Sequence, residues 1–240
     1  MSLSIPKSFY LCLTDLNLYD PSLGLATQIG QGEYLSLDPQ GAEHPDLVPV
    51  RLWTDHYQAY LARADLDRLQ VCHSIPPRSP HLDSVAIAQR LPEVIAYAIA
   101  AGQQPNQYLW GGRLPPNFDC SGLVQAAFAH GQIVIPRDAY QQEEFAQPIP
   151  LTANFNRWLQ QLLPGDLIFF GISKATHVAI YVGNSTYIHS SGATHGHNRI
   201  AIDRLWDPAN LELIPPCPAK YYAAQLRGAG RICQSYSPIF

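Results

Sequence analysis

The stretch Asn117-Phe118-Asp119-Cys120-Ser121-Gly122-Leu123 decides the fold of the carboxyl-terminal part of the chain. The helical pattern starts after Phe118-Asp119, which predicts a helix that begins at Cys120 and ends near Gly131. Apolar residues at helical spacing follow: Leu123, Val124, Ala127 and Phe128. Unpaired backbone N–H groups and the helix dipole favour a thiolate at such a position. We therefore interpret Cys120 as a nucleophile, with a buried structural cysteine as the open alternative.

The segments on either side of this helix indicate the fold class. Before it, Leu91 to Ile99 has helical spacing, with Pro92 in the expected first turn and Gly102 as the stop. After it, a Pro164-Gly165 turn introduces three strand-like runs: 166–170, 177–182 and 186–190. Helices first and strands afterwards predict an α+β fold.

The amino-terminal region has a different pattern. From Ser8 to about Val71, short apolar or alternating runs are separated by turn residues, which predicts a small all-β barrel or sandwich. Three prolines within Ile75–Pro80 then disfavour both helix and strand. We predict a β domain at residues 1–74, a proline-rich linker at 75–82 and a second domain at 83–240.

Composition limits the class of partner. The 240 residues are 47% hydrophobic and 14% charged, which is enough apolar material for two cores. A net charge of -4 leaves no basic surplus for nucleic acid or an anionic membrane. The early apolar run Phe9–Leu13 is too short for a signal-peptide core or a membrane span, so we expect a cytoplasmic protein. The five cysteines form no Cys-x-x-Cys pair, and most of them are interpreted as free thiols.

A thiol nucleophile needs a base that is held in place by a third group, and two histidines fit these roles. If 177–182 and 186–190 pair through the three-residue loop Gly183-Asn184-Ser185, His189 lies opposite Ala179. His177 and His189 are then diagonal neighbours on one face, with roughly 7–8 Å between their Cα atoms. A two-residue loop would break this arrangement. Taken alone, either histidine would most often be a partly buried polar group.

A metal site is the weaker interpretation of the remaining histidines. His195 and His197 could join His189 as ligands, but the loop between them is glycine-rich and has no carboxylate or cysteine at ligand spacing. A solvated loop fits these residues better. We expect neither metal nor cofactor.

Several segments together resemble the NlpC/P60 cysteine peptidases, which have a papain-like fold. Residues 105–195 carry the resemblance, because the segments occur in the same order and spacing as in that family. They are Tyr108-Leu109-Trp110-Gly111-Gly112, Asp119-Cys120-Ser121-Gly122-Leu123, Arg137-Asp138-Ala139-Tyr140-Gln141-Gln142, Pro164–Phe170, Thr176–Tyr181 and Tyr187–Gly192. The sequence is most similar to cyanobacterial-type members in which a bacterial SH3-like domain precedes the catalytic domain.

The resemblance implies an activity and a set of roles. Such members cleave the γ-D-glutamyl-meso-diaminopimelate bond of peptidoglycan stem peptides that have a free amino-terminal L-Ala. By this resemblance Cys120 attacks the carbonyl, His177 is the general base and then acid, and His189 fixes the tautomer and orientation of His177. Tyr108 is expected to help the Cys120 backbone N–H stabilise the oxyanion.

The same resemblance implies where the peptide binds. Asp119 and Tyr57 are expected to hold the free amino group, and Ser121 and Trp110 to line the pocket. Arg137 and Asp138 are interpreted as structural. Relatives often have a serine where this chain has Ala139, so one substrate hydrogen bond is missing or is supplied elsewhere.

We expect hydrolysis of released wall peptides, as in cell-wall recycling. Two alternatives stay open at this point. One is a catalytically silent wall-peptide-binding protein; the other is an amidase or acyltransferase that uses the same cysteine on another substrate.

Overall fold

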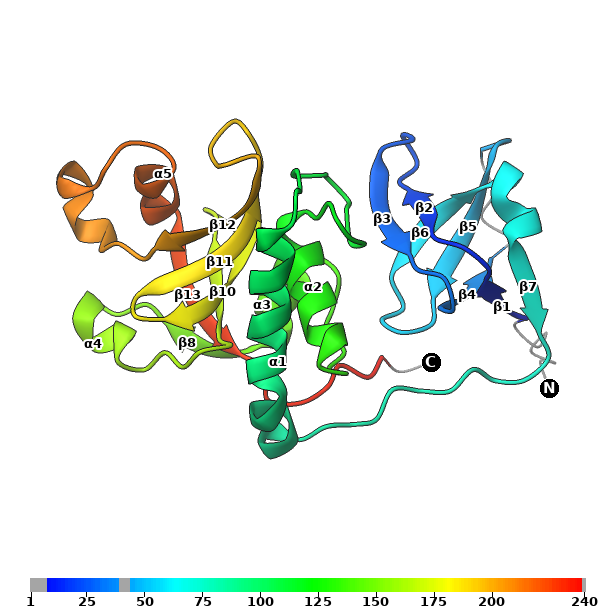
Figure 1. Cartoon of the computed structure of the whole chain (residues 1–240), viewed down its shortest axis with the longest axis horizontal. Helices are drawn as coiled ribbons and strands as arrows, with labels where there is room; N and C mark the ends of the chain where they lie inside the picture. The colour runs from blue at the N-terminus through cyan, green and yellow to red at the C-terminus, as the bar shows by residue number, and fades with distance from the viewer. Residues whose placement is uncertain (1–7, 39–43, 239–240) are drawn as a thin grey trace. The chain divides into compact units, whose positions relative to one another are not determined.

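The computed structural model describes residues 8–38 and 44–238, which divide into two compact units. One unit contains the described residues up to Ser79, and the other is Pro80–Ser237 (Figure 1). The division falls inside the proline-rich segment, where Pro cannot donate to a strand ladder. The domain limits given above stay a prediction.

The first unit is a seven-stranded antiparallel sheet. Its strand order is β3-β2-β6-β5-β4-β1-β7. Strand bounds are β1 (Phe9–Cys12), β2 (Leu16–Tyr19), β3 (Leu25–Ile29), β4 (Tyr34–Leu37), β5 (Leu47–Leu52), β6 (Gln58–Ala62) and β7 (Leu69–Cys72), with a 3₁₀ segment η2 (Arg63–Arg68) before β7. Alternate residues, such as Leu16 and Leu18 of β2, are buried in one cluster, as expected for a sheet with one face on a core.

The small β unit expected from the sequence is therefore present, but a closed SH3-like barrel is not confirmed. Across residues 8–38 and 44–79, pairing runs from β3 to β7, and these two strands are not paired with each other. Spacing of apolar residues predicts strands, whereas closure depends on shear and tilt, which the spacing does not encode.

The second unit is built on a six-stranded antiparallel sheet in the order β12-β11-β10-β9-β13-β8. Its strands are β8 (Gln147–Pro150), β9 (Leu167–Phe170), β10 (His177–Gly183), β11 (Thr186–Ser191), β12 (Arg199–Arg204) and β13 (Leu226–Arg231). The helices are α1 (Ser84–Gln103), α2 (Cys120–His130), α3 (Ala139–Phe145), α4 (Phe155–Leu159) and α5 (Ala219–Ala224), with a 3₁₀ segment η3 (Pro208–Leu213). The mixture agrees with the expected α+β class.

Two cores lie on the two faces of this sheet. Val178 and Ile180 of β10 belong to a cluster with residues of α1 and α2, whereas Ala179 and Tyr181 belong to a second cluster with residues of α4 and α5. This is the period-two alternation of a strand that is covered on both faces. Figure 1 shows α1 and α2 on one side of the sheet and α4 and α5 on the other.

The helix expected near residue 91 begins earlier than predicted. Asp83 caps α1 by accepting a hydrogen bond from the backbone N–H of Ala86 at 2.9 Å, so Pro92 lies inside the helix and not in its first turn. The cap was the stronger start signal, because it satisfies an otherwise unpaired N–H. By length and composition α1 is also apolar enough to cross a membrane, which is weak evidence of a span; Val94 and Ala98 pack into the core.

Candidate active site

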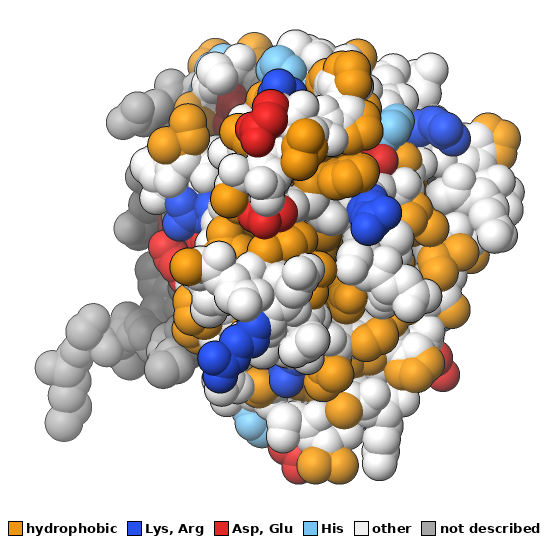
Figure 2. Space-filling model, turned by 90° about the vertical axis from the view of Figure 1, so that its left-hand side faces the viewer, with side chains coloured by type: hydrophobic (Ala, Val, Ile, Leu, Met, Phe, Trp, Pro, Cys, Tyr) orange, Lys and Arg blue, Asp and Glu red, His pale blue; other side chains and the backbone are white. Residues whose placement is uncertain are grey.

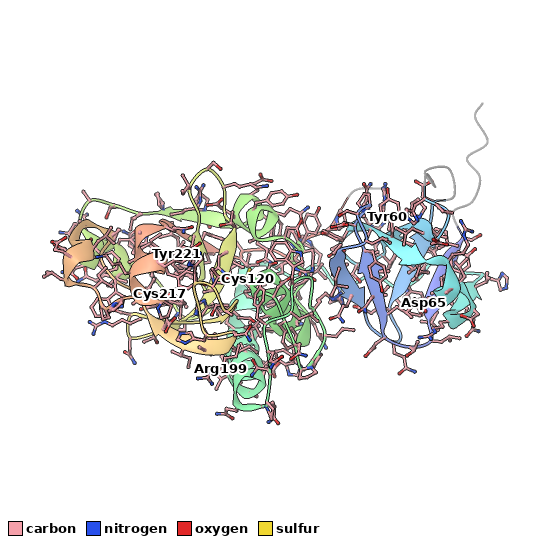
Figure 3. The ribbon with its side chains drawn as sticks, turned by 90° about the horizontal axis from the view of Figure 1, so that it is seen from above. Tyr60, Asp65, Cys120, Arg199, Cys217 and Tyr221 are labelled. Carbon is pink, nitrogen blue, oxygen red and sulfur yellow. The ribbon has the colours of Figure 1, made fainter. Side chains whose placement is uncertain are left out.

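Cys120 is the first residue of α2, as predicted. The Asp119 side chain caps the helix by accepting a hydrogen bond from the backbone N–H of Gly122 at 2.6 Å. The Cys120 residue is 7% exposed, and its sulfur accepts hydrogen bonds from the backbone N–H groups of Ser121 and Val178. The start of α2 therefore places the thiol beside strand β10. Figure 3 labels Cys120 within the second unit.

The electrostatic state of this thiol differs from the expectation. Burial, followed by the negative charge of Asp119, raises the pKa of Cys120 to about 12. The N–H groups of Val178 and Ser121 lower the pKa, as a helix start should, but burial outweighs them. The pKa of the Cys120 thiol is therefore shifted in the direction opposite to the one expected from the helix start.

The two predicted partner histidines meet directly. His177 Nε2 and His189 Nδ1 lie 2.7 Å apart, and the two rings are nearly perpendicular at 85°. His189 has no exposed surface. The diagonal arrangement predicted from the hairpin is confirmed.

The hairpin reaches this register by a route different from the predicted one. The loop is only Asn184-Ser185, both with positive φ, and Gly183 pairs with Thr186. A register shift between Tyr181 and Gly183 makes Val182 an extra residue, so Ile180 still faces Ile188. The two-residue turn alone would have separated the histidines, but the bulge restores the register.

Both histidines are neutral at neutral pH. Burial lowers the pKa of His177 well below its usual value, and a positive charge on His189 would lower it further. Burial also lowers the pKa of His189, although a hydrogen bond to Asp203 acts in the opposite direction. A neutral imidazole can accept the proton of a neutral thiol, as general-base catalysis requires.

Two further residues extend the histidine pair. His189 Nε2 lies 3.1 Å from Asp203 Oδ2, and His197 Nε2 lies 3.0 Å from each oxygen of the same carboxylate. Asp203 is on β12, where it faces Tyr187 and is thus a diagonal neighbour of His189. Asp203 was not among the predicted site residues, and His197 was expected in a solvated loop. The available signal was the alternation of apolar and polar residues in 199–204, which is typical of a strand.

His189, His197 and Asp203 also form a group that could hold a metal ion. Their candidate ligand atoms lie within 4.8 Å of one another. Asp203 supplies a carboxylate that the spacing along the sequence does not place near these histidines. In the structure each of these atoms is engaged in a hydrogen bond within the group.

Asp119 is the centre of a buried polar network. Arg137 donates to both of its carboxylate oxygens, at 2.6 and 3.1 Å, and the side chain of Arg137 is 2% exposed. The backbone N–H of Gly111, at 3.0 Å, and the hydroxyl of Ser121, at 3.3 Å, also donate to Asp119. Arg137 is structural, as expected. Ser121 is turned into this network and also accepts a hydrogen bond from Arg137 at 2.9 Å.

Gly122 is required because the backbone passes so close to it. A Cβ at this position would lie 2.0 Å from the carbonyl oxygen of Gly112. The same oxygen accepts a hydrogen bond from the backbone N–H of Asp119 at 3.0 Å. This contact holds the segment 108–112 against the start of α2.

Two tyrosines lie near the thiol. Burial raises the pKa of Tyr108, and a negative charge on Cys120 would raise it further, so its phenol keeps its proton and can donate a hydrogen bond. Burial also raises the pKa of Tyr222, and a negative charge on Cys120 would act in the same direction, while a hydrogen bond from Ser191 lowers it. The Tyr222 ring lies 4.8 Å from that of His177. Tyr222 was missed, because nothing in the sequence of α5 marks it.

Trp110 and Tyr57 were also predicted to bind the substrate. Trp110 is 71% exposed, in the segment that precedes Gly111. Tyr57 belongs to the first unit, in the turn between β5 and β6, where its backbone N–H donates to Asp55 at 3.0 Å. The roles proposed for Tyr57, Trp110 and Ser121 in substrate binding stay predictions.

Part of the chain, which contains the residues described above, is similar to known proteins. Residues 105–210 match the NlpC/P60 family model. The bifunctional muramidase/DL-endopeptidase CwlT of Bacillus subtilis is 43% identical over 89 residues, which are 35% of this chain and 25% of that protein. Dipeptidyl-peptidase 6 of Lysinibacillus sphaericus is 36% identical over 98 residues, 41% of this chain and 31% of that protein.

A solved structure of similar description was also found. An NlpC/P60 family protein from Bacillus cereus has 22% sequence identity and a TM-score of 0.46, and the match covers 95% of this chain and 64% of that one. A probable endopeptidase of Mycobacterium bovis is also similar, and the match covers 20% of its length. This chain therefore spans less than a third of the length of each of these three relatives. The segment matched by the family model contains Cys120, His177, His189, His197 and Asp203.

Proposed function

We propose that this chain, in which residues 105–210 form an NlpC/P60 family peptidase domain, is a cysteine endopeptidase of peptidoglycan stem peptides. The observation that carries the proposal is the 2.7 Å contact between His189 of β11 and His177 of β10, the strand beside Cys120. The names endopeptidase, DL-endopeptidase and dipeptidyl-peptidase among the relatives support hydrolysis of such peptides.

The proposed reaction uses the neutral imidazole of His177, which is in contact with His189, as the base. As the sulfur of Cys120 attacks the carbonyl carbon of the γ-D-glutamyl amide, His177 takes the thiol proton. The C–N bond then breaks, His177 returns the proton to the leaving amine of diaminopimelate, and a thioester remains on Cys120. A water molecule, deprotonated by His177, releases the acid and restores the thiol.

The oxyanion formed during attack needs donors. The backbone N–H of Cys120 lies in the first turn of α2, where N–H groups have no partner within the helix. The protonated phenol of Tyr108 is the proposed second donor, and the effect of Cys120 on its pKa supports their proximity. Removing one such donor typically costs about 10²–10³ in kcat.

The proposed substrate is L-Ala-γ-D-Glu-meso-diaminopimelate with a free amino group, recognised by Asp119 and Tyr57. Asp119 already accepts five hydrogen bonds, so a substrate ammonium would share a carboxylate that is partly neutralised by Arg137. We therefore treat the amine requirement as a separate part of the proposal. Action on released wall fragments in the cytoplasm stays a prediction from the sequence.

Nucleic acid is not part of the proposed substrate. On the face that Figure 2 shows, Lys and Arg side chains stand in separate places among neutral and hydrophobic ones. Binding to a phosphate backbone requires these charges to gather on one surface.

Product analysis of the tripeptide tests the proposal. The protein is incubated with L-Ala-γ-D-Glu-meso-diaminopimelate and with its N-acetylated form, and products are identified by mass spectrometry. Release of diaminopimelate from the free-amine peptide alone supports both the bond and the amine requirement. Equal cleavage of both peptides refutes amine recognition, and no cleavage of either refutes the proposed substrate.

A further inference from the structure

We propose that Asp203 is a positioning residue, which selects the tautomers of His189 and His177 and is itself held by His197. This inference rests on the proposed function, because it assigns to the histidine pair a task in proton transfer from Cys120. Asp203 and His197 have no role in the resemblance described above. Their hydrogen bonds to one another and to His189 carry the argument.

The direction of each hydrogen bond follows from the carboxylate. An ionised carboxylate can only accept, so the nitrogen of His189 that faces Asp203, Nε2, must carry the hydrogen. A neutral imidazole has one N–H, which leaves Nδ1 of His189 as an acceptor. His177 must then donate to it through Nε2–H across the 2.7 Å contact. Nδ1 of His177 is left with a free lone pair, which is the form that can accept a proton from Cys120.

The opposite set of tautomers would disable the base. If His189 carried its hydrogen on Nδ1, it would donate to Nε2 of His177. His177 would then carry its own hydrogen on Nδ1 and could not accept another as a neutral ring. The two histidines alone are compatible with either direction, so a group outside the pair must choose between them.

Asp203 is ionised and well oriented for this choice. Burial raises its pKa, but the hydrogen bonds that it accepts from His189 and His197 help to lower it overall. His197 Nε2 lies 3.0 Å from both carboxylate oxygens, so it fixes the orientation of the carboxylate as well as supporting its charge.

The loop that carries His197 is anchored to the same strand as His189. The His197 backbone N–H donates to the hydroxyl of Ser191 at 3.0 Å. Gly196 passes so close to Ser191 that a Cβ on it would lie 2.3 Å from the Ser191 hydroxyl oxygen. This approach holds His197 beside Asp203.

Aromatic rings restrict His189 to one orientation. Tyr187 and Tyr222 each place a ring 5.0 Å from the His189 ring, at 75° and 81° respectively. The titratable groups around the Asp203 carboxylate are thus His189, His197 and the two phenols, whose pKa values burial raises, so both stay neutral. Asp203 supplies the negative charge among these groups.

A purely structural role for Asp203 is the alternative, because its hydrogen bond also joins β12 to β11. The two roles are separated by the Asp203→Asn variant, since an amide can donate to Nε2 of His189 and so favour the opposite tautomers. Asp207→Asn is the matched control. Asp207 caps η3 by accepting from Ala209 at 3.0 Å, outside the site.

The test combines nitrogen NMR with kinetics on the full chain. Histidine tautomers are read from ¹⁵N shifts at pH 7.5, with His177 and His189 assigned through single His→Gln variants. We expect the hydrogen on Nε2 of both rings in the wild type and in Asp207→Asn, and a shift toward Nδ1 in Asp203→Asn. Cleavage of the tripeptide by Asp203→Asn should fall about 10²–10³-fold in kcat with KM within threefold, while Asp203→Glu recovers part of the loss.

Each outcome decides the inference. A hydrogen on Nδ1 of His189 in the wild type overturns it whether or not the variants fold. Unchanged tautomers in Asp203→Asn, or a kcat within threefold of the wild type, also overturn it. If the wild type cleaves no stem peptide, the proposed function fails, whereas the NMR result still shows whether Asp203 selects the tautomers.

Discussion

Replacing Gly122 by alanine should displace Cys120, the proposed nucleophile. The new Cβ would lie 2.0 Å from the carbonyl oxygen of Gly112, whereas ordinary contact begins near 3.4 Å. Either the start of α2 or the segment around Gly112 must therefore move by about 1.4 Å. Neither group is a flexible side-chain end, and the Gly112 oxygen is also tied to the Asp119 N–H.

The expected magnitude follows from this displacement. A misplacement of about 1 Å can reduce an enzymatic rate by about 10²-fold, so we expect Gly122→Ala to lose at least that factor in kcat/KM, or about 2.7 kcal/mol. Overpacking of the site should also lower the free energy of unfolding by about 1–3 kcal/mol. The assays are release of diaminopimelate from the tripeptide and urea denaturation.

Gly102→Ala is the matched control, because it makes the same substitution in helix α1. There the new Cβ meets Cγ2 of Ile200 at 3.0 Å, and that side chain can move. Alanine is favoured over glycine in a helix by about 1 kcal/mol, so this variant should be close to the wild type in stability and activity. A Gly122→Ala protein with kcat/KM within threefold of the wild type would refute the reasoning.

Three other predictions concern charge in the buried site. Below about pH 6.5 the histidines of the unfolded chain take up protons, whereas buried His177 and His189 do not. The free energy of unfolding, measured by urea denaturation, should therefore decrease as the pH is lowered from 7.5 to 5.5, by up to about 1.4 kcal/mol per pH unit for each histidine. A free energy that does not change over this range would contradict the prediction. Because burial raises the pKa of Cys120 to about 12, its alkylation by iodoacetamide, followed by peptide mass spectrometry, should rise about tenfold per pH unit from pH 7 to 9, whereas a plateau from pH 5 would indicate a thiolate–imidazolium pair. Arg137→Met should cost about 3–5 kcal/mol in urea denaturation, because it leaves the buried Asp119 charge unpaired; a cost below 1 kcal/mol would show that Asp119 is solvated or protonated.

Features specified by neighbouring residues could be predicted from the sequence. Asp119 and Cys120 mark the start of α2 because a helix needs its first N–H groups satisfied, and the structure shows this cap. The His177–His189 contact was predicted from the alternation of a hairpin. The predicted length of the hairpin loop was wrong, because the turn is one residue shorter and a bulge at Val182 compensates for the difference. No local sequence pattern indicates such a compensation.

Features that depend on distant segments could not be predicted in this way. Asp203 reaches His189 only because β12 pairs with β11 across the loop that carries His197. Tyr222 comes from α5, which packs on the opposite face from α2. The pKa of Cys120 was predicted in the wrong direction, because burial is a property of the whole core and outweighs the local helix start.

The account depends most on Cys120 as the nucleophile that opens the γ-D-glutamyl amide. The most direct measurement is the rate of diaminopimelate release from L-Ala-γ-D-Glu-meso-diaminopimelate by the wild type and by Cys120→Ala, with folding of both checked by circular dichroism. We predict release by the wild type and none by the folded variant. Release by Cys120→Ala at more than a small fraction of the wild-type rate, or none by either protein, would contradict the account.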